Sequence, residues 1–292
     1  MKAFIKLSKK DKLNIFNQVS EKSGLPSSAV EKDWWVTLSL NIIFSLPYSK
    51  HIVFKGGTSL SKAWNLIERF SEDIDLVIDR KHLGFEGELS KTQVKKLRKA
   101  SCSFIGSEFY KDINEALIKL GLQDYELVVQ ETKDTHTDPL IIELRYKSLT
   151  ETSDYLRPKV LIEVGARSLM EPVENKAIIS MVSEGFRELP FAETEITIPV
   201  VSPKRTFLEK IFLLHEEFQK GTQFIRVERM SRHLYDLEKL MDTIHGTEAL
   251  KDIELYNKIV AHRKNFNAIR GIDYANHSPQ LINILPPEET IK

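Results

Sequence analysis

The sequence predicts an α+β fold, with a mixed β-sheet flanked by helices in the first half of the chain and mostly helices in the second. Two observations predict this class. Short runs that are apolar throughout, or that alternate between apolar and polar residues as strands do, are concentrated before Gly165. Apolar residues spaced three and four apart, as on one face of an amphipathic helix, dominate after Arg167.

The boundary between the two regions is expected at residues 166–175, where Gly165 and Pro172 interrupt the periodic pattern. We therefore expect an N-terminal region of residues 1–168 and a mainly helical C-terminal region of residues 169–292. Ligands commonly bind between two such regions, so a functional site is expected in the cleft that the second region completes.

Each expected element follows from local apolar spacing and from residues that start or stop helices and turns. In the N-terminal region we expect helices at 8–22 and 27–45, a strand at 52–54, a helix at 60–70, a strand at 73–78, one or two amphipathic helices within 90–121, paired strands at 125–129 and 140–146 around a polar turn at 133–138, and a short strand at 160–164. In the C-terminal region we expect helices at 204–215 and 229–240 and one extended segment at 196–201.

The stretch from residue 51 to residue 79 carries the most informative pattern, in which a strand, a glycine turn, a helix and a second strand follow one another. The second strand contains Asp73 and Asp75, which leave one face, while Ile74 and Leu76 leave the other. Aspartates are poor strand formers, and such a violation of a local rule is expected at functional sites. Two carboxylates about 7 Å apart along one strand face can share hard divalent cations.

The glycine turn before the helix, Gly56-Gly57-Thr58, predicts a phosphate-binding site. Glycines let backbone N–H groups approach an anion closely, and the following helix N-terminus favours negative charge. A phosphate cradle joined by one helix to a metal-binding acidic pair is what nucleotidyl transfer requires. The ordinary alternatives are a turn that is only geometric and an exposed acidic strand face.

A third carboxylate is expected from Glu163, which interrupts the apolar run at 160–164. A lone glutamate in a buried strand is costly unless it is paired or bound to a metal. The alternative is a structural ion pair with Arg145 or Arg167. Glu143 is a rival for the third position, because it interrupts a similar run.

Several motifs resemble the bacterial AbiEii/AbiGii toxin family, whose members are nucleotidyltransferase-like proteins related to the DNA polymerase beta superfamily. The motifs are residues 55–60 (KGGTSL) with 71–76 (SEDIDL), 31–36 (EKDWWV), 162–165 (IEVG), 209–210 (EK) and 231–237 (SRHLYDL). The resemblance covers roughly residues 20–245. It implies a polymerase-beta-like mixed sheet, Mg²⁺ as cofactor with Mn²⁺ as the substitute, and toxins of type IV toxin–antitoxin or phage-defence systems.

The resemblance also implies roles for individual residues. Asp73, Asp75 and Glu163 would be the catalytic carboxylates, the first two as metal ligands, and Lys210 and Asp236 would complete the catalytic set. The residues that would bind the nucleotide are Lys55, Gly56, Gly57, Thr58, Ser59 and Arg232. Thr58 stands where the wider superfamily has serine, which leaves open whether Thr58 or Ser59 contacts the phosphates. The alternatives are a solvated Lys210 and a surface ion pair between Arg232 and Asp236, one helical turn apart.

Composition sets limits on location and partners. The 42 basic and 42 acidic residues give zero net charge, so nucleic acid could be bound only through local patches. The basic runs at 91–99 and 262–270 are the first places to look for such a patch. The single cysteine, Cys102, excludes an internal disulfide, and no signal peptide or membrane span is indicated, so we expect a cytoplasmic protein.

The leading hypothesis is an enzyme that moves a nucleoside monophosphate from an NTP to a hydroxyl. The acceptor would be the 3′ end of tRNA, as the resemblance implies, or a protein hydroxyl. A cognate antitoxin would act without forming a stable complex. The alternative is a nucleotide-binding regulator without transfer activity, although a binder has no need for three acidic residues around a phosphate.

Overall fold

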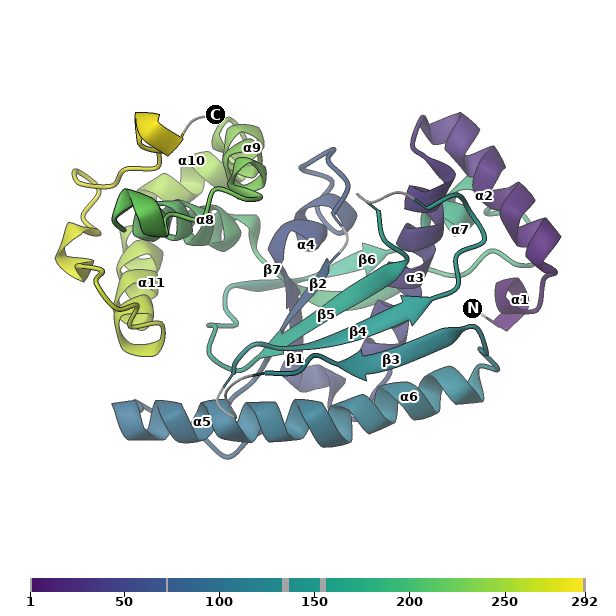
Figure 1. The fold of residues 1–292 in the computed structure, drawn as a ribbon, viewed down its shortest axis with the longest axis horizontal. Helices are drawn as coiled ribbons and strands as arrows, with labels where there is room; N and C mark the ends of the chain where they lie inside the picture. The colour runs from purple at the N-terminus through teal and green to yellow at the C-terminus, as the bar shows by residue number, and fades with distance from the viewer. Residues whose placement is uncertain (1, 72, 133–136, 153–155, 291–292) are drawn as a thin grey trace.

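The computed structural model describes residues 2–71, 73–132, 137–152 and 156–290 (Figure 1). The strands are β1 (Ile52–Lys55), β2 (Asp73–Ile78), β3 (Tyr125–Val129), β4 (Leu140–Tyr146), β5 (Lys159–Gly165), β6 (Val173–Ile178) and β7 (Ile196–Val201). The helices before β7 are α1 (Lys2–Ile5), α2 (Lys9–Ser23), α3 (Ser27–Phe44), α4 (Gly56–Lys62), α5 (Lys91–Phe104), α6 (Tyr110–Lys119) and α7 (Met181–Gly185). The helices after it are α8 (Pro203–Phe218), α9 (Met230–Met241), α10 (Ile244–Lys251) and α11 (Ile253–Phe266).

The strands form one seven-stranded sheet in the order β3-β4-β5-β2-β1-β7-β6. Strand β2 pairs in parallel with β5 and antiparallel with β1, and β1 in turn is parallel to β7. The expected α+β class with a mixed sheet is therefore confirmed. The paired strands expected at 125–129 and 140–146 are also confirmed as β3 and β4, while residues 133–136 of the turn between them lie outside the described residues.

The apolar face of the sheet is covered by helices, which leaves the opposite face free to carry the polar residues of the central strands. Ile74 and Leu76 of β2 belong to the same buried cluster as Trp34 of α3, Leu97 of α5 and Leu117 of α6. Helices α5 and α6 continue into one another through a π-helical turn and run as one rod along the sheet in Figure 1. This agrees with the one or two amphipathic helices expected within 90–121.

The helix expected to reach residue 70 is shorter than the sequence indicates. Helix α4 ends at Lys62, and Asn65 has a left-handed backbone with φ of 52°. Apolar residues at helical spacing continue beyond this point, but Ile67 packs into the C-terminal core instead of extending the helix. The segment from residue 63 to residue 71 is therefore a loop that leads back to β2.

The expectation of helices immediately after Arg167 is also wrong, because β6 and β7 pair with one another and β7 extends the sheet beside β1. Strand β6 forms the sheet edge and carries charged residues, which are typical of protected edges. Because of these charges, the segment lacks the apolar pattern that predicts a strand. The expected division at 168/169 falls within this sheet. We propose that the mainly helical C-terminal region begins after Val201 instead.

Helices α8 to α11 form a separate helical group, at the left in Figure 1, with its own buried cluster. Leu60 of α4 and Ile67 of the following loop belong to this second cluster, so the segment between β1 and β2 anchors the helical group to the sheet. Within the described residues, no helix is both long enough and apolar enough to cross a membrane.

Candidate active site

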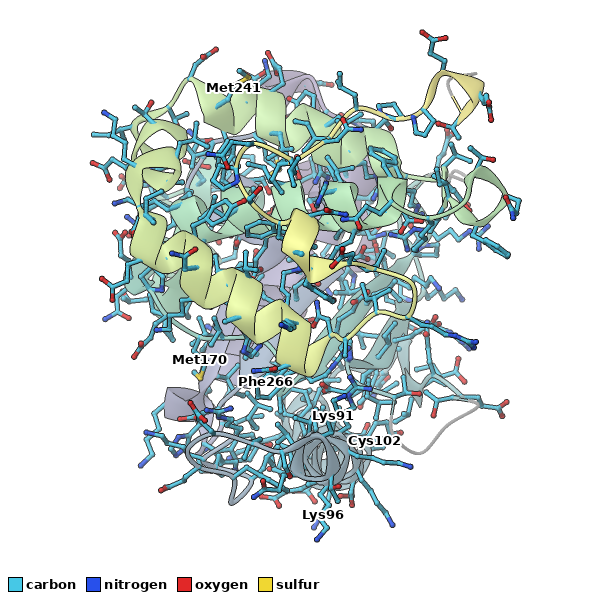
Figure 2. All side chains as sticks on the ribbon, turned by 90° about the vertical axis from the view of Figure 1, so that its left-hand side faces the viewer. Lys91, Lys96, Cys102, Met170, Met241 and Phe266 are labelled. Atoms are coloured by element: carbon cyan, nitrogen blue, oxygen red, sulfur yellow. The ribbon has the colours of Figure 1, made fainter. Side chains whose placement is uncertain are left out.

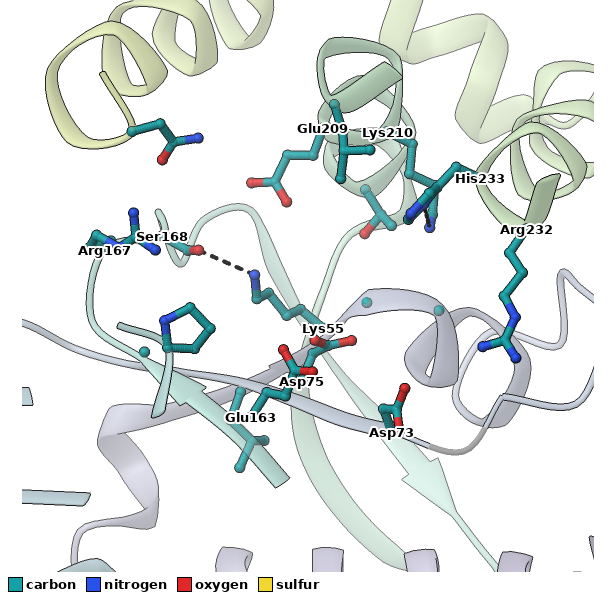
Figure 3. Close-up of a pocket in the computed structure, with 18 of the residues that line it drawn as sticks. Lys55, Asp73, Asp75, Glu163, Arg167, Ser168, Glu209, Lys210, Arg232 and His233 are labelled. Atoms are coloured by element: carbon teal, nitrogen blue, oxygen red, sulfur yellow. Dashed lines mark hydrogen bonds between the residues drawn. The ribbon is translucent and has the colours of Figure 1, made fainter. Parts of the chain in front are cut away.

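A cavity of about 630 Å³ lies where the polar face of the sheet meets α8 and α9 (Figure 3). This volume is within the range of small-molecule sites. The charged residues lining it are Lys55, Arg69, Asp73, Asp75, Asp138, Glu163, Arg167, Glu209, Lys210, Arg226, Glu228, Arg229, Arg232 and Arg263. These residues come from the sheet and from the C-terminal helices, so the cavity exists only when the helical group is docked on the sheet.

Three carboxylates converge at the floor of the cavity. The parallel register of β2 and β5 pairs Asp75 with Glu163, and Asp73 lies two residues away on the same face. Neither Asp75 nor Glu163 has a hydrogen bond or ion pair within the described part of the chain. Burial raises the pKa of Asp75, and burial together with Asp75 and Asp73 raises the pKa of Glu163 to about 7. The uncompensated negative charge favours binding of a cation.

Gly56 allows the turn after β1 to lie directly against this carboxylate cluster. Its φ is +79°, and a Cβ atom built on it would stand 1.9 Å from the Oδ2 atom of Asp75. At Gly57, a Cβ atom would stand 2.7 Å from Nη2 of Arg69. Gly56 therefore allows a close approach that a larger residue would disturb, whereas a side chain at Gly57 would require Arg69 to move, and both glycines line the cavity with backbone atoms.

The side chains of Thr58 and Ser59 are turned into the protein. Thr58 is buried, and its hydroxyl donates to the backbone carbonyl of Asp73 and lies 2.9 Å from Ser71 Oγ. Ser59 is also buried and donates to the carbonyl of Gly56 at 2.8 Å. These hydroxyls hold the turn and β2 together, so any contact of residues 58 and 59 with a nucleotide is restricted to their backbone.

Asp236 binds two cations that reach the cavity from different elements. It accepts two hydrogen bonds from Arg69, at 2.6 and 2.7 Å, and pairs with Lys210 at 2.8 Å. Asp236 is fully buried and Lys210 is 7% exposed, so the solvated alternative for Lys210 is excluded. The nearby His233 has its pKa lowered to about 4 by burial and by Lys210, and its neutral ring lies 3.4 Å from the lysine Nζ.

Lys55 and Glu209 face one another across the cavity. Lys55 Nζ donates to Ser168 Oγ at 3.2 Å, as Figure 3 shows. Glu209 binds the buried guanidinium of Arg205, which together with Lys55 lowers the pKa of the glutamate to about 2. Glu209 therefore stays ionised on the roof of the cavity, opposite the carboxylates of the floor.

The structure distinguishes the two glutamates considered for the third position. Glu143 accepts hydrogen bonds from Gln130, Lys159 and Arg145 and does not line the cavity. Arg167, the other arginine considered as a partner of Glu163, pairs with Asp138 at 2.8 Å. Only Glu163 of the two lies beside Asp75.

Other residues singled out in the sequence have structural roles. Glu31 is buried and binds the backbone N–H groups of Leu149 and Thr150, and Trp34 lies in the core. Cys102 is half-buried against the same core. Within 262–270, Arg263 donates from Nε and Nη2 to the two carboxylate oxygens of Glu216, which neutralises its charge.

Residues 41–290 match the family model of the nucleotidyl transferase AbiEii toxin of type IV toxin–antitoxin systems. The chain belongs to the AbiEii family. It is thus a nucleotidyltransferase, of a family of toxins whose systems include an antitoxin partner. The resemblance seen in the sequence motifs is confirmed, and a regulator without transfer activity is not what this family implies.

Similarity to individual proteins is more distant. No curated protein matches this AbiEii chain. Among solved structures it is similar to MenT4, a nucleotidyltransferase toxin from Mycobacterium tuberculosis H37Rv, with 20% identity over 88% of this chain and 73% of that chain and a TM-score of 0.49. It is also similar to an antigenic nucleotidyltransferase-like protein from Paracoccidioides brasiliensis, with 13% identity over 79% of this chain and 91% of that chain and a TM-score of 0.34.

Arg69 was not among the predicted site residues, although its guanidinium lies beside Gly57 and lines the cavity. It lies in the segment expected to be helical and is separated from its partner Asp236 by 167 residues. The only local signal was its position shortly before the acidic strand. Arg226 and Arg229, between α8 and α9, also line the cavity and were not expected there.

Proposed function

We propose that this AbiEii protein transfers a nucleoside monophosphate from an NTP to a hydroxyl acceptor, with a divalent cation bound by Asp73 and Asp75. The observation that carries the proposal is the pair formed by Asp75 and Glu163, which face the cavity without a compensating partner in the described residues. Burial raises the pKa of both carboxyl groups, and the two aspartates raise that of Glu163 further, so a bound cation would stabilise the ionised forms.

The donor set suits a hard cation, because carboxylate oxygens are the ligands that Mg²⁺ and Mn²⁺ prefer. The described residues contain no preformed group of three His, Cys, Asp or Glu ligands. Mg²⁺ commonly uses one or two carboxylates and completes its coordination with water and substrate phosphates, which fits this donor set. When bound, such ions clamp the attacking and leaving oxygens of a phosphoryl transfer.

The remaining residues would place the substrates. The backbone of Gly56 and Gly57 would contact the triphosphate, and Lys55 and Lys210 would offset its negative charge from opposite walls. Arg69 and Lys210 are held in position by Asp236, which thereby acts on the phosphates through its two cations. Glu163, which lies beside Asp75 on the neighbouring strand, would accept the proton of the attacking hydroxyl.

We further propose that the acceptor is the 3′ end of tRNA and that the antitoxin acts without a stable complex, as the family resemblance implies. Incubation of the protein with each labelled NTP, Mg²⁺ or Mn²⁺, and total RNA or cell lysate tests this. We expect label in the tRNA fraction with the wild type and none with Asp75→Asn. Label in protein alone would exclude tRNA as the acceptor, and absence of any label would contradict transfer itself.

A further inference from the structure

The segment between α8 and α9, residues 222–229, combines two features that surface segments rarely show together. Phe224 is 70% exposed and Val227 is 53% exposed, and the residues of the segment that line the cavity are Arg226, Glu228 and Arg229. Arg226 and Arg229 line the cavity, and neither side chain has a hydrogen-bonding or ionic partner in the part of the chain that the structure describes. We call residues 222–229 the rim segment.

The rim segment is held firmly despite its exposed side chains. Ile225 and Met230 are buried, and the backbone N–H of Arg226 donates to Glu217 Oε1 at 2.7 Å. Glu217 itself is held by Lys220 at 2.7 Å. The exposure of Phe224 is therefore built into an anchored turn and is not the consequence of a loose loop.

The charges of the rim differ from those deeper in the cavity. Arg69 and Lys210 share the single carboxylate of Asp236, Arg167 pairs with Asp138, and Arg263 pairs with Glu216. Lys55 donates to the hydroxyl of Ser168. Within the described residues, Arg226 and Arg229 form no ion pair, although Glu228 between them also lines the cavity, so their charge is available to a ligand that approaches the cavity from outside. Because the whole chain has zero net charge, an anionic polymer must be attracted by local cations of this kind.

We propose that the rim segment binds the single-stranded end of an RNA acceptor, with a base stacked on Phe224 and phosphates bound by Arg226 and Arg229. Exposed aromatic rings beside cations are how proteins bind single strands without reading their sequence. Arg226 and Arg229 line the same cavity as Asp73 and Asp75, so a strand bound at the rim would have its terminal hydroxyl within the cavity that holds these carboxylates.

The basic run of α5 does not offer the same arrangement. Lys91 and Lys96 lie at the end of the molecule opposite Met241 of α9 in Figure 2, and they do not line the cavity. Arg98 of the same helix donates to the carbonyl of Phe266 instead. The rim segment is therefore the better candidate for the surface that presents an acceptor.

The inference rests on the proposed transfer reaction, so its test separates RNA binding from transfer. The variants are Phe224→Ala and the double variant Arg226→Glu, Arg229→Glu. The control is Ile118→Ala with Lys119→Glu, which changes an exposed apolar residue and an exposed cation on α6, outside the cavity lining. Binding of a short 5′-fluorescent RNA is measured by anisotropy without NTP, and KM for total tRNA is measured with labelled NTP.

Phe224→Ala should weaken RNA binding about tenfold, as loss of one stacked base does, with unchanged NTP affinity and melting. The double arginine variant should weaken RNA binding further and flatten the dependence of log affinity on log salt by about 1.4, for two lost single-strand phosphate contacts. The control should bind RNA as the wild type does.

Unchanged RNA affinity in both rim variants would overturn the inference while leaving transfer intact. The same holds if the wild type labels only protein, since an RNA-binding rim then has no role in the reaction. If the wild type transfers no label at all, the proposed function fails, and the anisotropy measurement still decides whether the rim binds RNA.

Discussion

Glu143 and Glu163 lie on the same face of neighbouring strands, because Glu163 pairs with Ile141 two residues before Glu143. Glu143 is surrounded by donors, and Lys159, Gln130 and Arg145 lower its pKa to about 2. Glu163 faces two aspartates, and its pKa is raised to about 7. The first carboxylate is satisfied by hydrogen bonds from the protein itself, whereas the second has no hydrogen-bonding or ionic partner among the described residues and is offset only in part by the nearby Lys55.

The comparison suggests that neutralised carboxylates in this fold hold the structure and uncompensated ones do chemistry. The surroundings of Glu143 and those of Glu163 can be altered separately, because Glu163 lines the cavity and Glu143 does not. The cavity also contains a neutralised carboxylate, that of Asp236, which is paired with Arg69 and Lys210. Variants of this group show whether a neutralised carboxylate inside the site is structural as well.

The largest difference in transfer activity is expected between a variant that loses a carboxylate of the cavity and one that loses the carboxylate of Glu143. Asp75→Asn should abolish transfer while melting is unchanged or slightly higher, because a buried and repelled carboxylate is removed. Glu143→Gln should retain transfer per folded molecule and lose about 1–3 kcal/mol of stability, since Lys159 and Arg145 lose their acceptor. Labelled-NTP transfer and thermal unfolding check both. Near-wild-type transfer by Asp75→Asn would break the comparison.

The second prediction concerns the close approach of the glycine turn to Asp75. Gly56→Ala should reduce transfer strongly, because its Cβ atom would displace the Asp75 carboxylate. Gly121→Ala is a matched control, with φ of +80° against +79° and nothing within 4 Å of the added atom. Both variants should lose about 1–2 kcal/mol for the left-handed backbone. Equal transfer by the two would show that the position of Asp75 is not critical.

The third prediction concerns the neutralised group inside the cleft. Lys210→Met should lower transfer about a hundredfold, as removal of one charge-stabilising donor does. Because Lys210 is buried and paired, its loss should also reduce stability, contrary to the expectation for a solvated lysine. Lys62→Met breaks a similarly buried pair with Asp33 outside the cavity and should reduce stability alone. A Lys210→Met protein with normal turnover would assign the lysine a purely structural role.

The smallest effect concerns how stability depends on pH in the absence of metal. Glu143 and Glu163 should contribute to this dependence with opposite signs. Between about 2 and 4.5 the unfolded state binds more protons at Glu143, so its contribution makes stability rise with pH. Between 4.5 and about 7 the folded state binds more protons at Glu163, so its contribution makes stability fall. Each slope is at most about 1.4 kcal/mol per pH unit.

Chemical unfolding across this pH range in EDTA, with Glu143→Gln and Glu163→Gln, separates the two contributions. Glu163→Gln should reduce the decline above 4.5 and leave the part that belongs to Asp75, whose pKa burial also raises, and Glu143→Gln should reduce the rise below 4.5. Saturating Mg²⁺ should also suppress the decline, because a bound cation favours the ionised carboxylate. A decline of unchanged size in Glu163→Gln would assign it to Asp75 or another group instead of Glu163.

Local patterns in the sequence were sufficient to predict the carboxylates of the site. Alternation with period two placed Asp73 and Asp75 on one strand face, and the cost of an unpaired charge in an apolar strand drew attention to Glu163. Both arguments depend only on neighbours in the chain. The α+β class was predicted for the same reason.

The errors occurred where tertiary contacts override local spacing. Ile67 has helical spacing from Leu60 but packs against the C-terminal helices, so α4 ends early. The pairing of Arg69 with Asp236 joins residues too far apart in sequence for any spacing rule to connect them. The hydroxyls of Thr58 and Ser59 looked like phosphate ligands, yet they satisfy backbone carbonyls that the turn would otherwise leave unpaired.

The order of the site residues along the chain has a consequence for biosynthesis. Asp73 and Asp75 leave a translating ribosome well before Asp236, which positions Arg69 and Lys210, has been added. A nascent or prematurely truncated chain therefore has the acidic strand without its anchored cations. We expect such chains to be inactive, so that toxicity arises only after α9 has been synthesised and docked.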